Sequence, residues 1–171
     1  IEAIRMGVED LYDATAYILE HSDEWNIDKT KIVIIGSSAG ATNSNMAEYG
    51  ICNRSPLAKK YLPENFNYAG VISMAGAFWF WDPNTSLEWK EKPGAWMFFH
   101  GSKDQLVTYD VNQEGFAGYG PVYVHKQLEE MKSPYWFYDF PGGDHIISAT
   151  PMIDNWLEIE IFLTKFIKEE Q

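Results

Sequence analysis

The hydrophobic positions along the chain alternate between helical and strand-like spacing. In residues 1–22, apolar side chains recur every three or four positions, which predicts an amphipathic helix. Short continuous apolar runs predict four strands, and further helical spacings predict three more helices. The predicted strands span 31–35, 69–74, 95–100 and 135–140, and the later helices span 39–49, 121–132 and a last segment from Pro151.

The last helix carries the clearest boundary signal, because Thr150 can cap it and Pro151 suits its first position. Its predicted inward face consists of Ile153, Trp156, Leu157, Ile161 and Phe166. Residues 51–68 and 79–94, and the Gly- and Tyr-rich segment before residue 121, are expected to be irregular.

Helices that alternate with strands predict an α/β fold, a mostly parallel sheet with helices on both faces. The strand at 31–35 is rich in Ile and Val and flanked by few polar residues, so we expect it to be parallel and buried on both faces. The length of 171 residues predicts a single domain. In such sheets ligands bind at the carboxyl ends of the strands.

Charge and composition exclude several classes of protein. A net charge of −12 argues against partners such as nucleic acids and anionic membranes, which need clustered Lys and Arg. No apolar run approaches the roughly 20 residues of a membrane span. The single cysteine, Cys52, excludes an internal disulfide and a thiolate zinc site, and we expect an inert buried thiol there. No metal site is predicted.

The segment KIVIIGSSAGA, residues 31–41, places a serine between two glycines where a strand meets a helix. A tight turn of this kind strains the central backbone and lifts the Ser38 side chain off the sheet. We expect bulky side chains at positions 36 and 40 to collide, which would explain Gly36 and Gly40. Ser38 is therefore a candidate nucleophile, and the backbone N–H of Ala39 is a candidate oxyanion donor.

A serine nucleophile needs a base, and the base needs an orienting carboxylate. Asp104 follows the predicted strand at 95–100, and His145 follows the strand at 135–140. The order Ser, Asp, His, with each residue beyond the end of a strand, is that of a hydrolase triad. Asp144 and Asp82 remain alternatives for the acid, whereas Asp139 is interpreted as a packing or surface residue.

Other residues of the same chemical types receive simpler interpretations. Ser37 is off-centre in the turn and is expected to point into packing. His100 is expected to pack at a strand end near the site. His21 and His125 lie on predicted helices and are interpreted as solvated surface residues.

The segments NIDKTKIVIIGSSAGA, FFHGSKDQLV and FPGGDHI resemble the α/β-hydrolase superfamily, in particular its carboxylesterase and acetyl-esterase branch, which includes carbohydrate esterases. The resemblance covers nearly the whole chain. It implies Ser38 as nucleophile, His145 as general base and acid, and Asp104 as the carboxylate that orients His145. It also implies the Ala39 oxyanion donor, and chemistry that needs no cofactor.

The N-terminal part of the sequence differs from the usual pattern of that family. Members usually carry four more strands before the first helix, and a His-Gly-Gly-type segment there gives a second oxyanion N–H. We therefore expect residues 1–171 to form the C-terminal portion of a single α/β-hydrolase domain, with an exposed edge on the nucleophile strand. Such a portion should be poorly active unless another segment or a second copy completes it.

The resemblance implies cleavage of carboxylic esters through an acyl-enzyme, with small acyl or hydroxycinnamoyl groups, carried on carbohydrates, as expected substrates. Trp79, Phe80 and Trp81, in FWFWDPNTSLEW, either line the substrate pocket or form a separate hydrophobic cluster. Two other functions stay open. One is a serine peptidase of the prolyl-oligopeptidase type, and the other is a non-catalytic binding protein with the same fold.

Overall fold

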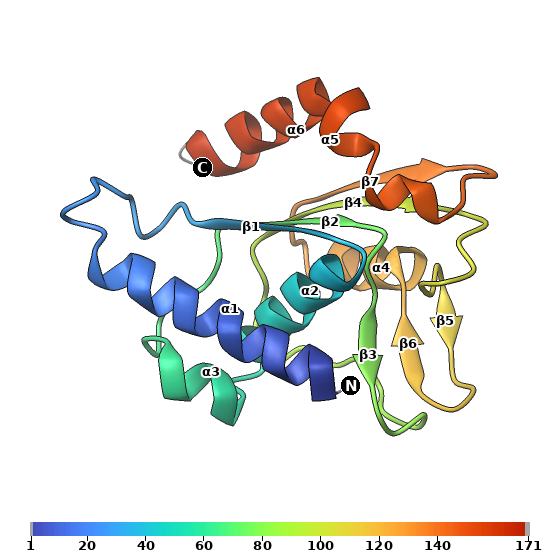
Figure 1. Ribbon diagram of the computed structural model, residues 1–171, viewed down its shortest axis with the longest axis horizontal. Helices are drawn as coiled ribbons and strands as arrows, with labels where there is room; N and C mark the ends of the chain where they lie inside the picture. Colours follow the sequence, from blue (N-terminus) through green and yellow to red (C-terminus); the bar gives the residue numbers. More distant parts are fainter. Residues whose placement is uncertain (1, 170–171) are drawn as a thin grey trace.

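The computed structural model describes residues 2–169 (Figure 1). A four-stranded sheet forms its centre, with strand order β1-β2-β4-β7 and every neighbouring pair parallel. Its strands are β1 (Val33–Ser37), β2 (Gly70–Met74), β4 (Ala95–Gly101) and β7 (Tyr135–Phe140). The carboxyl ends of all four strands meet at one edge, as the alternation of elements predicts.

Two layers of helices cover the sheet, which confirms the predicted fold class (Figure 1). One face packs against α1 (Glu2–Glu20), α2 (Ala39–Cys52) and α4 (Pro121–Glu130), through core residues such as Val71, Trp96 and Phe98. The other face packs against α6 (Trp156–Leu163), through Ile72, Met97 and Phe99. The central strands β2 and β4 are buried along their whole length, because helices cover both of their faces.

Two short features are missing from the sequence prediction. Helix α3 (Pro56–Tyr61) lies in the segment expected to be irregular. Ser55 caps this helix, because its side chain accepts a hydrogen bond from the Ala58 N–H. A small antiparallel sheet joins β3 (Phe78–Phe80), β6 (Ala117–Tyr119) and β5 (Val111–Asn112). Strands of two or three residues are too short for a periodic pattern.

Strand β1 differs from its prediction in position and burial. It spans Val33–Ser37 rather than 31–35, and its residues alternate between buried and exposed. Ile34 packs on the α1 and α2 side, whereas Ile35 on the opposite face is 45% exposed. The expectation of burial on both faces is wrong, because the core under α6 reaches Val33 but not Ile35. Among the described strands, β2 alone pairs with β1.

The final helical segment also differs from its prediction. It divides into α5 (Pro151–Asp154), α6 and a π-helical turn over Thr164–Lys168, and no side-chain cap from Thr150 forms. The buried residues that pack against the sheet are Ile159, Phe162 and Ile167, and the partly buried Leu163 and Phe166 pack beside them, so the prediction for Phe166 is correct. Most of the predicted inward face is instead exposed, with values of 82% at Ile153, 55% at Trp156, 65% at Leu157 and 43% at Ile161. The helix is apolar on nearly every side, so its pattern does not specify one face.

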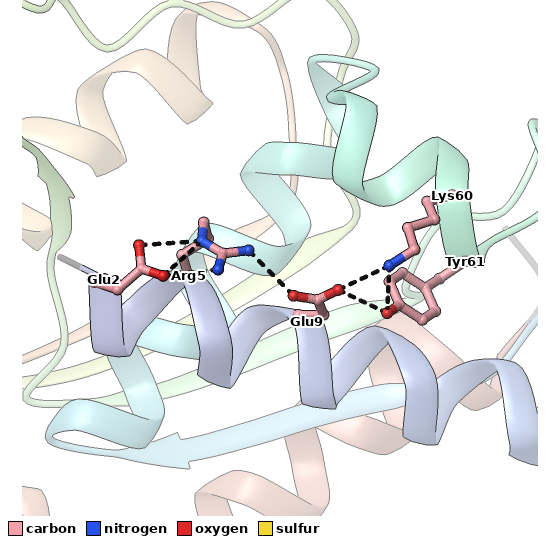
Figure 2. A network of polar contacts seen from close by, with 5 residues as sticks. All are labelled: Glu2, Arg5, Glu9, Lys60 and Tyr61. Atoms are coloured by element: carbon pink, nitrogen blue, oxygen red, sulfur yellow. Dashed lines mark hydrogen bonds and ion pairs between the residues drawn. The ribbon is translucent and has the colours of Figure 1, made fainter.

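Polar contacts tie the outer helices together (Figure 2). Glu9 on α1 accepts hydrogen bonds from Arg5, and from Lys60 and Tyr61 on α3. Hydrogen bonds from Tyr61 and Lys60 lower the pKa of Glu9 to about 2.

Ile1, which opens the predicted apolar face of the first helix, lies outside the described residues. Within residues 2–169, no helix combines the length and apolar character needed to cross a bilayer.

Glu48 on α2 is a buried carboxyl group beneath the sheet, with no exposed surface. Its Oε1 atom accepts a hydrogen bond from the Gly94 N–H at 3.2 Å, while Oε2 has no partner among the described residues. Burial raises the pKa of Glu48 to about 7. The folded protein therefore holds this carboxyl protonated over a range of pH in which an unfolded chain ionises it.

We predict that Glu48→Gln removes a pH dependence of stability. The preference of the fold for protonated Glu48 is fully present below pH about 4.3 and is lost as pH rises to about 7. The free energy of unfolding should fall by up to about 3 kcal/mol more in the wild type than in Glu48→Gln over this range. Urea denaturation at several pH values measures it. The exposed Glu130→Gln variant should behave like the wild type, and equal slopes for wild type and Glu48→Gln would contradict the prediction.

Candidate active site

Ser38 occupies the single position between β1 and α2. Its backbone has φ 52° and ψ −117°, a region that non-glycine residues avoid. Two hydrogen bonds fix this geometry. The Ser38 N–H donates to the Met74 carbonyl on β2 at 2.9 Å, and the Ser38 carbonyl accepts from the Thr42 N–H of α2 at 3.0 Å. The strained turn expected from the sequence is therefore held by elements on both sides.

The two flanking glycines serve different purposes. A Cβ atom at Gly36 would overlap the backbone of Gly40 and Ala41, so this position requires glycine. A Cβ atom at Gly40 would meet nothing within 4 Å outside its own helix backbone. The expectation of collisions on both sides is wrong for Gly40, because the first turn of α2 presents that position to open space.

The structure brings Ser38, His145 and Asp104 into one hydrogen-bonded chain. The Ser38 hydroxyl lies 2.8 Å from Nε2 of His145, and Nδ1 of His145 lies 2.8 Å from Oδ2 of Asp104. Asp104 sits in the turn after β4, and His145 opens a short 3₁₀ helix, η1 (His145–Ser148), after β7. Three loops at the same sheet edge thus supply a hydroxyl, an imidazole and a carboxylate in contact.

The Asp104 carboxylate is buried and held by several donors. Oδ1 accepts hydrogen bonds from the N–H groups of Leu106 at 2.9 Å and Val107 at 3.0 Å. Burial raises the pKa of Asp104, but the hydrogen bonds from His145, Val107 and Leu106 outweigh it and hold the pKa below its ordinary value. Asp104 is therefore ionised at neutral pH and fixes the orientation of His145.

His100 contacts Asp104 directly, whereas the sequence predicts only that it packs at a strand end near the site. It is 1% exposed, and its Nε2 atom lies 3.3 Å from both Oδ2 of Asp104 and the Val107 carbonyl. Burial lowers the pKa of His100, which favours the neutral ring. Because both neighbours are acceptors, Nε2 carries the proton and supports the carboxylate. The one signal in the sequence is the spacing of four residues between His100 and Asp104.

Ser37 does not point into packing as expected. Its side chain is exposed, and its hydroxyl donates to the Ser148 carbonyl at 2.6 Å. This contact joins the end of β1 to the end of η1, the segment that His145 opens. The nucleophile turn and the histidine loop are therefore linked by a second hydrogen bond.

The alternative acids have other partners. Asp144 accepts from the Ile146 N–H at 3.0 Å, Asp82 from the Asn84 N–H at 2.9 Å, and Asp139 from the Tyr109 hydroxyl at 2.8 Å. Among the described hydrogen bonds, none joins these three carboxylates to His145. The position of Asp139 matches its interpretation as a surface pair.

The remaining histidines and the cysteine lie outside this cluster. The His21 ring lies between Tyr17 and Trp25, and the His125 ring packs near Tyr135 and Phe137, so neither is the fully solvated side chain expected. Cys52 is buried, as expected, and burial raises the pKa of its thiol. Within residues 2–169, no three His, Cys, Asp or Glu side chains are placed to share a metal ion.

The aromatic residues proposed for substrate binding occupy three environments. Phe80 packs against Tyr49, with ring centroids 5.3 Å apart. Trp79 packs against Phe116 at 5.1 Å and lines an apolar cavity of about 270 Å³ between α1 and α2. Trp81 is 78% exposed. Their role in substrate binding stays a prediction.

Ala39 is the first residue of α2, so its N–H has no partner within the helix. It is also the residue that follows Ser38, the candidate nucleophile, and the positive end of the helix lies there. This is the position expected of an oxyanion donor.

The fold is that of α/β hydrolases. Similar solved structures include an α/β hydrolase, MGS-M1, from a Medee basin deep-sea metagenome library, with a TM-score of 0.58 and 19% identity over 95% of this chain. Esterase B from Lactobacillus rhamnosis gives 0.59 and 13% over 94%, and a truncated carbohydrate esterase from gut microbiota gives 0.61 and 12% over 95%. Identities this low establish the fold alone.

A family model described as BD-FAE matches residues 4–97, more than half of the sequence. The chain therefore belongs to the BD-FAE family, an α/β-hydrolase family. A comparison with curated proteins finds no match. The chain spans 65% of MGS-M1, 61% of the Lactobacillus esterase and 68% of the carbohydrate esterase.

We predict opposite effects on stability for alanine at the two glycines of the nucleophile turn. Gly36→Ala should lower the free energy of unfolding by roughly 1–3 kcal/mol or more, because its Cβ atom overlaps backbone that cannot move independently. Gly40→Ala should be neutral or stabilise the protein by up to about 1 kcal/mol, because alanine is the better helix former. Urea denaturation of both variants checks the pair, and equal destabilisation would contradict the asymmetry.

Proposed function

We propose that this protein is a serine hydrolase that cleaves carboxylic esters through Ser38, His145 and Asp104. The observation that carries the proposal is the hydrogen-bonded chain from the Ser38 hydroxyl through His145 to Asp104, with both contacts at 2.8 Å. The strained turn at Ser38 adds support, because strained backbone that the surrounding structure holds in place clusters at active sites. Membership of an α/β-hydrolase family and the likeness to esterases agree with this assignment.

In the proposed mechanism, Ser38 Oγ attacks the ester carbonyl while His145 Nε2 accepts the hydroxyl proton. Asp104 stabilises the imidazolium through Nδ1, and the Ala39 N–H donates to the developing oxyanion. The carbon–oxygen bond to the alcohol then breaks, and Nε2 returns the proton to the leaving oxygen. Water then attacks the acyl carbonyl while His145 Nε2 takes its proton. The bond from the acyl carbon to Ser38 Oγ breaks, Nε2 returns the proton to Oγ, and the acid is released.

We infer that the free edge of β1 is covered by a further strand, from another segment of the protein or from a second copy. The partly exposed Ile35 and the single partner of β1 among the described strands support this inference. The family resemblance implies that such a further segment of the protein also carries the second oxyanion donor, and removal of one such donor typically costs roughly 10²–10³ in turnover.

For the substrate, we propose small acyl or hydroxycinnamoyl esters carried on carbohydrates. The sequence resemblance to acetyl esterases supports this class, and one structural neighbour is described as a carbohydrate esterase. The aromatic segment that contains Trp79, Phe80 and Trp81 offers rings for stacking on such groups.

We predict that a fluorophosphonate forms a single adduct on Ser38, because this probe needs a serine activated by an aligned base. Intact mass and peptide mapping locate the adduct. Ser38→Ala and His145→Ala should both remove it, whereas Ser86→Ala, a change at an exposed loop serine, should keep it. An adduct that persists in Ser38→Ala, or labels another serine, would refute the proposed nucleophile.

We also predict that Asp104→Asn lowers ester turnover by about 10⁴-fold, since the amide favours the wrong tautomer of His145. Asp144→Asn should change turnover far less, because its carboxylate contacts the Ile146 N–H and not His145. Initial rates on acetyl esters at saturating substrate measure both. Turnover of peptide amides without turnover of esters would instead assign the protein to the serine peptidases.

A further inference from the structure

The carboxylate of Asp104 has four polar contacts, and the proposed mechanism uses only one of them. Its Oδ1 atom accepts the N–H groups of Leu106 and Val107, and its Oδ2 atom lies 2.8 Å from Nδ1 of His145. The fourth contact is Nε2 of His100, which lies 3.3 Å from the same Oδ2 atom. Because a carboxylate offers about four acceptor positions, the contact with His100 completes the set.

His100 is also tied to the turn that carries Asp104. Its Nε2 atom hydrogen bonds with the carbonyl of Val107 at 3.3 Å, and the Val107 N–H donates to Oδ1 of Asp104 at 3.0 Å. The proton on Nε2 therefore faces two acceptors of one turn. His100, Val107 and Asp104 form a closed ring of contacts, so the carboxylate cannot rotate without breaking one of them.

The His100 ring has little freedom to turn away. It lies near the end of β4, opposite Asp139 in the register with β7. The edge of the Tyr109 ring packs against it at 5.7 Å between centroids, and the Tyr109 hydroxyl donates to Asp139 at 2.8 Å. Only 1% of His100 is exposed, so its side chain does not reach a bound ester. An effect of His100 on the reaction would therefore have to pass through the Asp104 turn.

A neutral donor suits this position better than a charged one. Burial lowers the pKa of His100, which keeps its ring neutral. A protonated ring at 3.3 Å from Oδ2 would form an ion pair with Asp104 and weaken the attraction between Asp104 and the imidazolium of His145. The neutral ring contributes only a bond dipole, so the negative charge of Asp104 acts mainly on His145.

We propose that His100 is a positioning residue, which holds Oδ2 of Asp104 where it meets Nδ1 of His145. The inference rests on the proposed function, in which Asp104 orients His145 and stabilises its imidazolium form. Without the contact to His100, the carboxylate would be free to tilt about Oδ1, which the backbone N–H groups still hold. Such a tilt would lengthen the contact through which Asp104 orients the base.

Two variants of equal side-chain length test this role. Gln places an amide N–H where Nε2 of His100 lies, whereas Met has the same reach and no donor. In His100→Met, turnover of an acetyl ester should fall about tenfold with KM unchanged, because a donor to a charged group is lost away from the substrate. His100→Gln should keep most of the turnover. His100→Asn, whose amide falls short of Oδ2, should show the same loss as His100→Met and replaces that variant if it does not fold.

A double variant shows whether His100 acts through Asp104. In an Asp104→Asn background, where the carboxylate is absent, His100→Met should lower turnover by less than about twofold. A tenfold loss in both backgrounds would mean that His100 acts independently of Asp104, and would overturn the proposal. His125→Met, the same change at a histidine on α4, should keep the turnover of the wild type.

An NMR measurement separates this proposal from the proposed function. The Nδ1–H proton of His145 should give a signal protected from exchange with water, identified by its loss in His145→Ala. His100→Met should shift or broaden this signal, and His100→Gln should keep it. That result in a protein whose Ser38 does not react with a fluorophosphonate would support the positioning role while refuting the esterase. An unchanged signal in folded His100→Met, in a protein whose Ser38 does react, would overturn the positioning role alone.

Discussion

The conformation of the Ser38 backbone is the constraint on which the site depends. A φ of 52° in a non-glycine residue costs on the order of 1–3 kcal/mol, and the fold holds it with hydrogen bonds to Met74 on one side and Thr42 on the other. Relaxation of this turn would move the hydroxyl away from His145 and rotate the first turn of α2, which carries the Ala39 N–H. The strained turn, the proposed nucleophile and the proposed oxyanion donor therefore belong to one local structure. Gly36 is its steric requirement, because only a glycine allows the backbone of Gly40 and Ala41 to approach so closely.

The parallel sheet brings the other two groups to this turn. Neighbouring parallel strands end at the same edge, so the loops after β4 and β7 reach the nucleophile although they lie far away in the sequence. Each loop is then fixed by its own hydrogen bonds. Asp104 is held by the Leu106 and Val107 N–H groups and supported by His100. Short loops on the buried sheet therefore position the polar groups of the site. Because these loops supply the hydrogen bonds to Asp104, its pKa stays low although its carboxylate is buried.

Much of this arrangement could be predicted from the sequence, for a physical reason. Strands β2 and β4 are largely apolar runs that helices bury on both faces, which is the pattern typical of central parallel strands. Strand β7 carries a similar run, although it is only partly buried and its Asp139 is exposed. Once these strands are placed, the sequence shows that Ser38, Asp104 and His145 each follow the end of a strand, in that order. The hydrophobic pattern did not predict which residues face the core where an element is apolar on several sides. Helix α6 is apolar on nearly every side, so the positions of Ile159 and Phe162 against the sheet depend on tertiary packing.

The role of Ser37 was beyond prediction because it depends on a contact between distant segments, whereas the contacts of His100 with Asp104 and Val107 are local and depend on how the turn after β4 folds. Local spacing cannot show that the Ser37 hydroxyl meets the Ser148 carbonyl, since these residues come together only when β1 and η1 dock. That contact matters because η1 is a single turn of 3₁₀ helix, which has little stability of its own. A hydrogen bond of 2.6 Å at the far end of η1 limits how the turn can swing, and so limits the movement of His145 relative to Ser38. Ser37 thus restrains the segment that carries His145, the proposed base, while Ser38 contacts His145 directly.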